Sequence, residues 1–184
     1  MTERIDGRRI ALLVENDFDD REVSGLRRRL EALGAIVVVV GPSAGARYHG
    51  RLREEVVRAD VAAGAVRARD FDAVVVPGGW APDRMRLRHS MVDLVREMAG
   101  AGKPVAALSH GPQLCISANI VRGRTITCWP SIAIDVKNAG GLYVDRPVVE
   151  DGNVITSRKG DDLEPFCDAL AGALLRAPMP ASRR

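Results

Sequence analysis

The feature that most constrains this chain is a repeated alternation of short apolar runs with segments of helical periodicity. Residues 9–14, 35–40 and 73–76 are dominated by branched apolar side chains, as is typical of strands buried on both faces. Between the first two runs, apolar residues recur at helical spacing over residues 23–33, and Gly34 ends that segment. The pattern predicts an α/β fold with a mainly parallel central sheet and helices on both faces.

The rest of the chain extends the same pattern. Asp19 and Glu22 have the spacing of a capping box at the start of the first helix. Asp151-Gly152-Asn153 is a turn signal, which predicts a hairpin of residues 147–150 and 154–157. The other expected elements are a strand at 54–60, a loop or short helix at 62–69, a helix from Ser90 through Met98, a strand at 104–108, a helix at 112–119, a strand at 124–128 and a helix at 163–174.

Length and composition indicate one soluble domain. The chain has 184 residues, with 46% hydrophobic residues, 28% charged residues and a net charge of +3. We expect a flexible N-terminus over residues 1–8, a single domain over 9–176 and a disordered tail over 177–184. No apolar run is long enough for a membrane span, and the first residues lack the apolar core of a signal peptide. We therefore expect a cytoplasmic protein that contacts no membrane.

The composition also argues against nucleic acid, metals and other cofactors as partners. Arginine clusters occur, but no aromatic residues or reading motif accompany them, so we expect no nucleic-acid binding. The three cysteines, Cys115, Cys128 and Cys167, show no metal-ligand spacing, and we expect neither a metal nor another cofactor. Each cysteine is interpreted as a reduced core residue.

Three loops follow predicted strands and are expected to converge, because sites in such folds gather at the carboxyl ends of strands. They are residues 15–20, 77–83 and 109–112. The third loop has small residues two positions before and after Ser109, as a nucleophile elbow requires. A serine at this position is equally consistent with a simple helix cap. The Pro77-Gly78-Gly79 run is either a plain turn or a source of backbone donors for an oxyanion.

Longer stretches carry a resemblance to a known family. They are FDAVVVPGGWAPDRMR at residues 71–86, GKPVAALSHGPQL at 102–114 and NAGGLYVDRPVVEDGNVITSRKGDDLEPF at 138–166, with ENDFDD at 15–20. On these stretches the chain resembles the ThiJ/PfpI superfamily, most closely the PfpI-type intracellular protease branch. The resemblance covers nearly the whole domain. It implies a flavodoxin-like three-layer sandwich that forms homodimers or hexamers, and a protease, glyoxalase-type, deglycase, chaperone or hydratase activity.

The resemblance also implies a site. Its catalytic members would be Ser109, His110 and Asp17, with Gly78 and Gly79 as backbone donors and Trp80 and Trp129 in the pocket. Two residues depart from the family pattern: Ser109 stands where the family has cysteine, and Asp17 where most members have glutamate. Because a hydroxyl is much harder to ionise than a thiol, we expect thiol-dependent chemistry to be weak or absent.

Two interpretations of the site remain open at this point. The chain is either a hydrolase or glyoxalase/hydratase-like enzyme that acts through Ser109 on a small carbonyl or acyl substrate, or a non-catalytic binding or regulatory member that lost the thiol. The residues also leave open whether the serine was introduced to silence the site.

Overall fold

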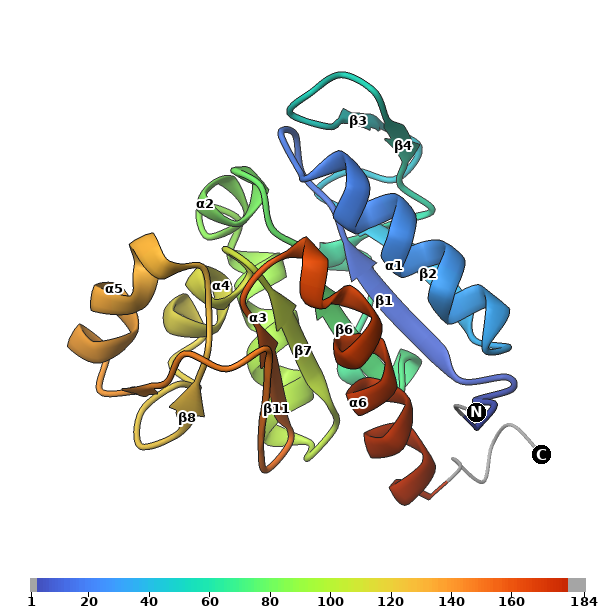
Figure 1. Cartoon of the computed structure of the whole chain (residues 1–184). Helices are drawn as coiled ribbons and strands as arrows, with labels where there is room; N and C mark the ends of the chain where they lie inside the picture. The colour runs from blue at the N-terminus through green and yellow to red at the C-terminus, as the bar shows by residue number, and fades with distance from the viewer. Residues whose placement is uncertain (1–2, 179–184) are drawn as a thin grey trace.

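The computed structural model describes residues 3–178, and its centre is a seven-stranded sheet (Figure 1). Neighbouring strands are parallel throughout except for the hairpin at one edge. The order across the sheet is β10 (Val148–Asp151), β11 (Val154–Ser157), β7 (Val105–Leu108), β6 (Ala73–Val76), β1 (Arg9–Leu13), β2 (Ile36–Gly41) and β5 (Val61–Ala62). This confirms the mainly parallel sheet expected from the alternating pattern and the flavodoxin-like fold implied by the family resemblance.

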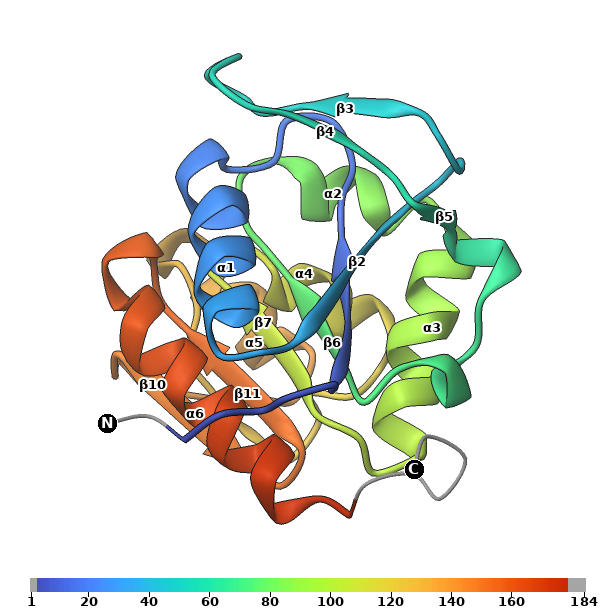
Figure 2. The same ribbon diagram turned by 90° about the vertical axis from the view of Figure 1, so that its right-hand side faces the viewer.

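Helices cover both faces of the sheet (Figure 2). One face carries α1 (Asp20–Ala32) and α6 (Leu163–Arg176), which pack against each other. The other carries α3 (His89–Gly100) and α4 (Pro112–Ser117). The remaining elements are α2 (Ala81–Met85), α5 (Ala133–Asn138), the β3 (Arg47–His49) and β4 (Val56–Arg58) pair, the β8 (Thr125–Ile126) and β9 (Leu142–Tyr143) pair, and short 3-10 turns at 63–65, 68–70, 130–132 and 160–162.

The core lies between these layers. Every residue of β6 and β7 is buried, as expected for central strands covered on both faces. Along α1 the inward side chains include Val23, Leu26 and Leu30, which confirms the helical spacing in the sequence. The three strands β7, β6 and β1 are neighbours, so the loops that follow them meet at one edge of the sheet.

Several short elements differ from expectation. The strand expected at 54–60 is only β4, which pairs with β3 in a separate hairpin above the end of the sheet (Figure 2). The helix expected from Ser90 begins at His89, with Arg88 at the N-cap. Neither α2 nor α5 was expected from the sequence, because each spans only about two turns or fewer and its residues show no clear period.

The chain ends meet at the base of the domain. Ile5 is buried and its N–H donates to the Leu33 carbonyl, so this part of the expected flexible N-terminus packs against α1. The Arg8 guanidinium donates to the carbonyls of Ala177 and Pro178. The remainder of the tail expected to be disordered, residues 179–184, lies outside the described residues.

Candidate active site

Ser109 occupies a sharp turn directly after β7. Its φ of 60° lies in the left-handed region, which non-glycine residues rarely adopt without a structural reason. A Cβ on Gly111 would lie 2.3 Å from the Val76 carbonyl oxygen, so only glycine fits two residues after the serine. Ser109 therefore lies at a tight turn between β7 and α4 that leaves room only for glycine at position 111.

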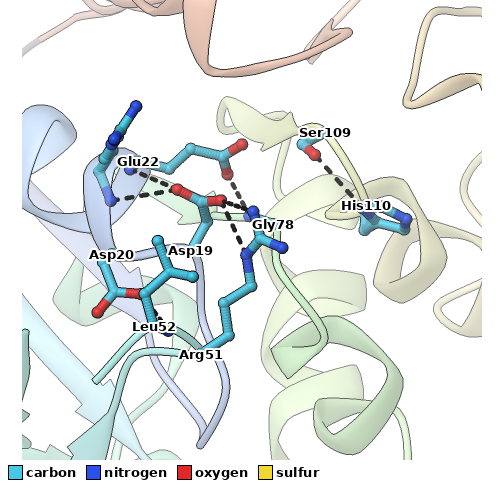
Figure 3. Close-up of polar contacts among 9 residues, drawn as sticks. Asp19, Asp20, Glu22, Arg51, Leu52, Gly78, Ser109 and His110 are labelled. Atoms are coloured by element: carbon cyan, nitrogen blue, oxygen red, sulfur yellow. Dashed lines mark hydrogen bonds and ion pairs between the residues drawn. The ribbon is translucent and has the colours of Figure 1, made fainter. Parts of the chain in front are cut away.

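The acidic side chain beside Ser109 is Glu22, which sequence reasoning did not identify as a site residue. Glu22 lies in the first turn of α1, and its Oε2 accepts a hydrogen bond of 2.7 Å from the Gly78 N–H (Figure 3). A Cβ on Gly78 would lie 2.7 Å from the Ser109 Cβ and 2.8 Å from Glu22 Oε2. The glycine is thus required because the serine and the carboxyl approach each other across it.

The environment of Glu22 shifts its acidity. Burial raises the pKa of Glu22 to about 7, and the negative charge of Asp19 acts in the same direction. Hydrogen bonds from the Gly78 N–H and the Ser109 hydroxyl, and the positive charge of Arg51, oppose that rise. Near neutral pH Glu22 is therefore divided between its protonated and ionised forms, the condition that general acid–base catalysis favours.

Asp17 is placed differently from the sequence prediction. It has a φ of 66°, and its carboxylate forms ion pairs with Arg84 and, at 3.7 Å, with Arg53. Its side chain does not line the cavity at Ser109. The turn directs the Asp17 carboxylate toward Arg84 of α2, so within residues 3–178 the catalytic role predicted for Asp17 has no support from a hydrogen bond to Ser109.

The two glycines also differ. The Gly78 N–H is occupied by Glu22, so Gly78 does not offer the free donor that the sequence predicted. Within residues 3–178 the Gly79 N–H has no hydrogen-bond partner, and Gly79 lines the cavity. Of the two, Gly79 is the available backbone donor.

His110 and the two tryptophans lie where the sequence predicted a pocket. His110 Nδ1 is 3.4 Å from Ser109 Oγ, a long contact. The imidazole stacks on Trp129, with ring centroids 5.7 Å apart. Burial lowers the pKa of His110, and the positive charge of Arg51 lowers it further, so the ring is neutral at pH 7. Trp80 and Trp129 both line the cavity and remain largely exposed.

The cavity in front of Ser109 has a volume of about 800 Å³ and is open to solvent. The cavity is lined by the aromatic rings and by charged side chains from separate segments. These charged side chains include Asp19, Arg21, Arg51 and Lys159. A space of this size accommodates a small organic molecule.

Arg51 comes from a loop that the sequence left unassigned. It forms an ion pair with Asp19 at 3.0 Å, and Asp19 also caps α1 by accepting from the N–H groups of Arg21 and Glu22 (Figure 3). The neighbouring Asp20 is almost fully buried and accepts from the N–H groups of Leu52, Glu54 and Glu55. The two carboxylates at the start of α1 therefore fix the β3–β4 hairpin above the cavity.

The cysteines and possible metal ligands add no chemistry here. Cys115, Cys128 and Cys167 are buried, and burial raises the pKa of each thiol to about 12. Cys128 is buried, whereas its neighbour Trp129 lines the cavity. Within residues 3–178 no cluster of three or more histidine, cysteine or acidic residues has the arrangement of a metal site. No helix in the same range is long and apolar enough to cross a membrane.

Comparison with known proteins identifies the family of the chain. The family model described as "DJ-1/PfpI family" matches residues 8–173. The chain belongs to the DJ-1/PfpI family. The match covers all of the elements that build the site, from β1 through most of α6.

Relatives within the DJ-1/PfpI family include proteins named as enzymes. The chain is 39% identical to protein/nucleic acid deglycase 2 of Escherichia coli over 86% of this chain and 93% of that protein. It is 40% identical to deglycase PfpI of Pyrococcus furiosus over 84% of this chain and 92% of that protein.

A solved structure extends the comparison to three dimensions. A two-domain protein from Anabaena variabilis, with DJ-1/ThiJ/PfpI-like and ferritin-like domains, superposes with a TM-score of 0.89 at 37% identity. The match covers 96% of this chain and 54% of that one, so the present chain corresponds to about half of the two-domain protein.

Proposed function

We propose that this DJ-1/PfpI protein is a hydrolase or glyoxalase/hydratase-like enzyme that acts on a small carbonyl or acyl compound through Ser109. The observation that carries the proposal is that the Ser109 hydroxyl and Glu22 Oε2 both lie against Gly78, where Glu22 is a buried carboxyl whose pKa is raised to about 7. The relatives named as deglycases support an enzymatic, hydrolase-like activity in general.

In the proposed step, ionised Glu22 takes the Ser109 proton while Oγ forms a bond to the carbonyl carbon. The carbonyl π bond breaks, and its electron pair becomes an oxyanion, which the Gly79 and His110 N–H groups are available to stabilise. With an acyl substrate, collapse of this adduct expels the leaving group, which takes the proton back from Glu22. Water then hydrolyses the serine ester.

A second candidate function is a binding or regulatory protein. It is favoured by the absence of a histidine–carboxylate pair at the serine, because His110 makes only the long contact to Oγ and stacks on Trp129. A serine triad relies on such a pair to remove the hydroxyl proton. In this alternative the cavity keeps its ligand, and Ser109 performs no chemistry.

The two functions are separated by methylglyoxal consumption, measured for the natural protein, Ser109→Ala and Ser109→Cys. The enzyme proposal expects turnover by the natural protein and its loss in Ser109→Ala. Turnover by Ser109→Cys alone would contradict the serine enzyme and support the binding protein that lost its thiol. If none of the three proteins consumes methylglyoxal, the same three are tested for hydrolysis of the acyl substrate p-nitrophenyl acetate. Absence of Ser109-dependent hydrolysis there would reject the enzyme proposal.

The expectation that the chain pairs with itself stays a prediction. Light scattering coupled to size-exclusion chromatography measures the mass of the particle, and a monomer would contradict the expected dimer or hexamer.

A further inference from the structure

In the part of the chain that the structure describes, some of the positively charged side chains that line the cavity at Ser109 are not held by an acidic partner. Arg21 lines it and its side chain forms no ion pair within residues 3–178. Lys159 pairs with Asp161 at 2.9 Å, but both groups are well exposed, and such pairs contribute little and rearrange easily. The wall that faces Ser109 therefore has cationic groups available for an anionic ligand.

Arg51 is the best placed of these groups because Asp19 holds only one side of it. Its Nε and Nη2 both donate to the same oxygen of Asp19, Oδ2, at 3.2 and 3.0 Å. The other oxygen of Asp19 is used as the cap of α1. Within the described range, 3–178, Arg51 Nη1 has no hydrogen-bond partner, so one edge of the guanidinium is free.

The position of Arg51 is fixed by buried structure. Its backbone N–H donates to the Phe18 carbonyl, and the next N–H, of Leu52, donates to the buried Asp20 (Figure 3). A Cβ on Gly50 would lie 1.9 Å from Asp20 Oδ1, which shows how closely the loop is held. A guanidinium fixed in this way loses little freedom when it binds a ligand.

The charge of Arg51 also reaches the groups that face the reacting atoms. After burial, it is the next contribution that lowers the pKa of His110, and it is among the groups that oppose the rise at Glu22. A ligand anion held at Arg51 would consequently lie near Ser109.

We propose that the substrate carries a carboxylate next to its carbonyl carbon, as a 2-oxo acid does, and that Arg51 binds this carboxylate while the carbonyl faces Ser109. Arg21, which also lines the cavity, adds attraction for the negative charge. A guanidinium pairs well with a carboxylate because its planar edge offers parallel N–H donors. The orientation of the carbonyl rests on the proposed function, whereas the binding of the carboxylate does not.

The test measures binding of pyruvate and of its uncharged analogue pyruvamide by calorimetry at low salt and pH 7.5. Natural protein is compared with Arg51→Ala and with Arg53→Ala. Arg53 lies on the same turn and is not among the residues that line the cavity, so its removal is a matched loss of one charge. We expect pyruvate to bind roughly 10- to 100-fold more tightly than pyruvamide, because hydrogen bonds between charged groups contribute about that much. Arg51→Ala should remove this preference and Arg53→Ala should keep it.

Equal binding of the two probes, no binding of pyruvate, or a preference that survives Arg51→Ala would each overturn the proposal. Ser109→Ala separates this outcome from failure of the proposed function. A pyruvate preference without any Ser109-dependent turnover would leave the carboxylate site standing and reject the enzyme. Ser109-dependent turnover without a pyruvate preference would reject the carboxylate site alone.

Discussion

Two buried carboxyls at the start of α1 show how different surroundings give neighbouring residues different roles. Asp20 receives three backbone N–H groups from the β3–β4 hairpin. Burial alone would raise its pKa, but these donors outweigh burial, and the pKa of Asp20 is lowered. Glu22 receives one N–H, from Gly78, and its pKa rises to about 7.

Burial acts more strongly on Glu22, whereas backbone donors are more numerous at Asp20, and together these two differences decide which carboxyl can exchange protons near neutral pH. Asp20 stays charged and anchors the hairpin that carries Arg51. Glu22 is left under-solvated beside Ser109, where it can take up or release a proton.

Of the changes considered, removal of the Asp20 carboxylate should lower the free energy of unfolding most. In Asp20→Ala three buried or partly buried N–H groups lose their acceptor, so we expect a loss of about 3 to 5 kcal/mol in the free energy of unfolding. Asp20→Asn keeps one acceptor oxygen and should lose less. Urea unfolding at pH 7 measures both variants. Equal losses, or a loss below about 1 kcal/mol in Asp20→Ala, would show that the hairpin is held by other contacts.

Replacement of the Glu22 carboxyl, which exchanges a proton near neutral pH, should affect turnover more than folding. Glu22→Gln keeps the shape of the side chain but cannot accept the Ser109 proton, so turnover should fall by about 100-fold or more. Asp17→Asn is the matched control, because Asp17 pairs with arginines away from the cavity, and its turnover should change little. A large loss of turnover in Asp17→Asn with little change in Glu22→Gln would indicate that Asp17, and not Glu22, is the catalytic acid.

The pH dependence of stability should report Glu22 separately from Asp20. Because its pKa is higher in the folded protein than the ordinary value of 4.5, Glu22 binds more protons when folded, and stability should fall as pH rises from 4.5 through about 7. A shift of this size corresponds to at most about 3 kcal/mol. The lowered pKa of Asp20 acts oppositely: its contribution is present above about 3.8 and is lost as pH falls further.

Urea unfolding of the natural protein and Glu22→Gln at pH 5 and pH 8 isolates the effect of Glu22, because Asp20 stays ionised throughout that range and the titration of His110 is common to both proteins. The fall in stability between these pH values should be smaller in Glu22→Gln than in the natural protein. An unchanged difference would mean that Glu22 is not the group that titrates.

The sequence predicted the sheet and the position of Ser109 because both depend on local patterns. Runs of branched residues define the buried strands, and the small residues around Ser109 indicate the tight turn. Glu22 was not singled out from the sequence because Asp19 and Glu22 have capping-box spacing. Asp19 does cap the helix, but Glu22 turns to Gly78 instead of back to the cap.

A signal for Glu22 was nevertheless present. Glu22 precedes Leu26 and Leu30 at intervals of four residues, so it lies on the apolar stripe of α1, where a carboxyl is buried and needs a special partner. Arg51 offered no comparable signal. Its place depends on hydrogen bonds between the hairpin and Asp20, which lie far apart in the chain, and no local pattern encodes them.

The most direct test of the account is the pKa of Glu22 itself. Carbon-detected NMR of the side-chain carboxyl, titrated from pH 4 to pH 9 and assigned with Glu22→Gln, measures it without any assumption about substrate. We expect a midpoint of about 7 in the natural protein and a higher midpoint in Ser109→Ala, where the hydrogen bond from the hydroxyl is lost. Since that hydrogen bond favours the charged form, the shift should be upward. A midpoint near the ordinary 4.5, unchanged in Ser109→Ala, would contradict the pairing of Glu22 with Ser109.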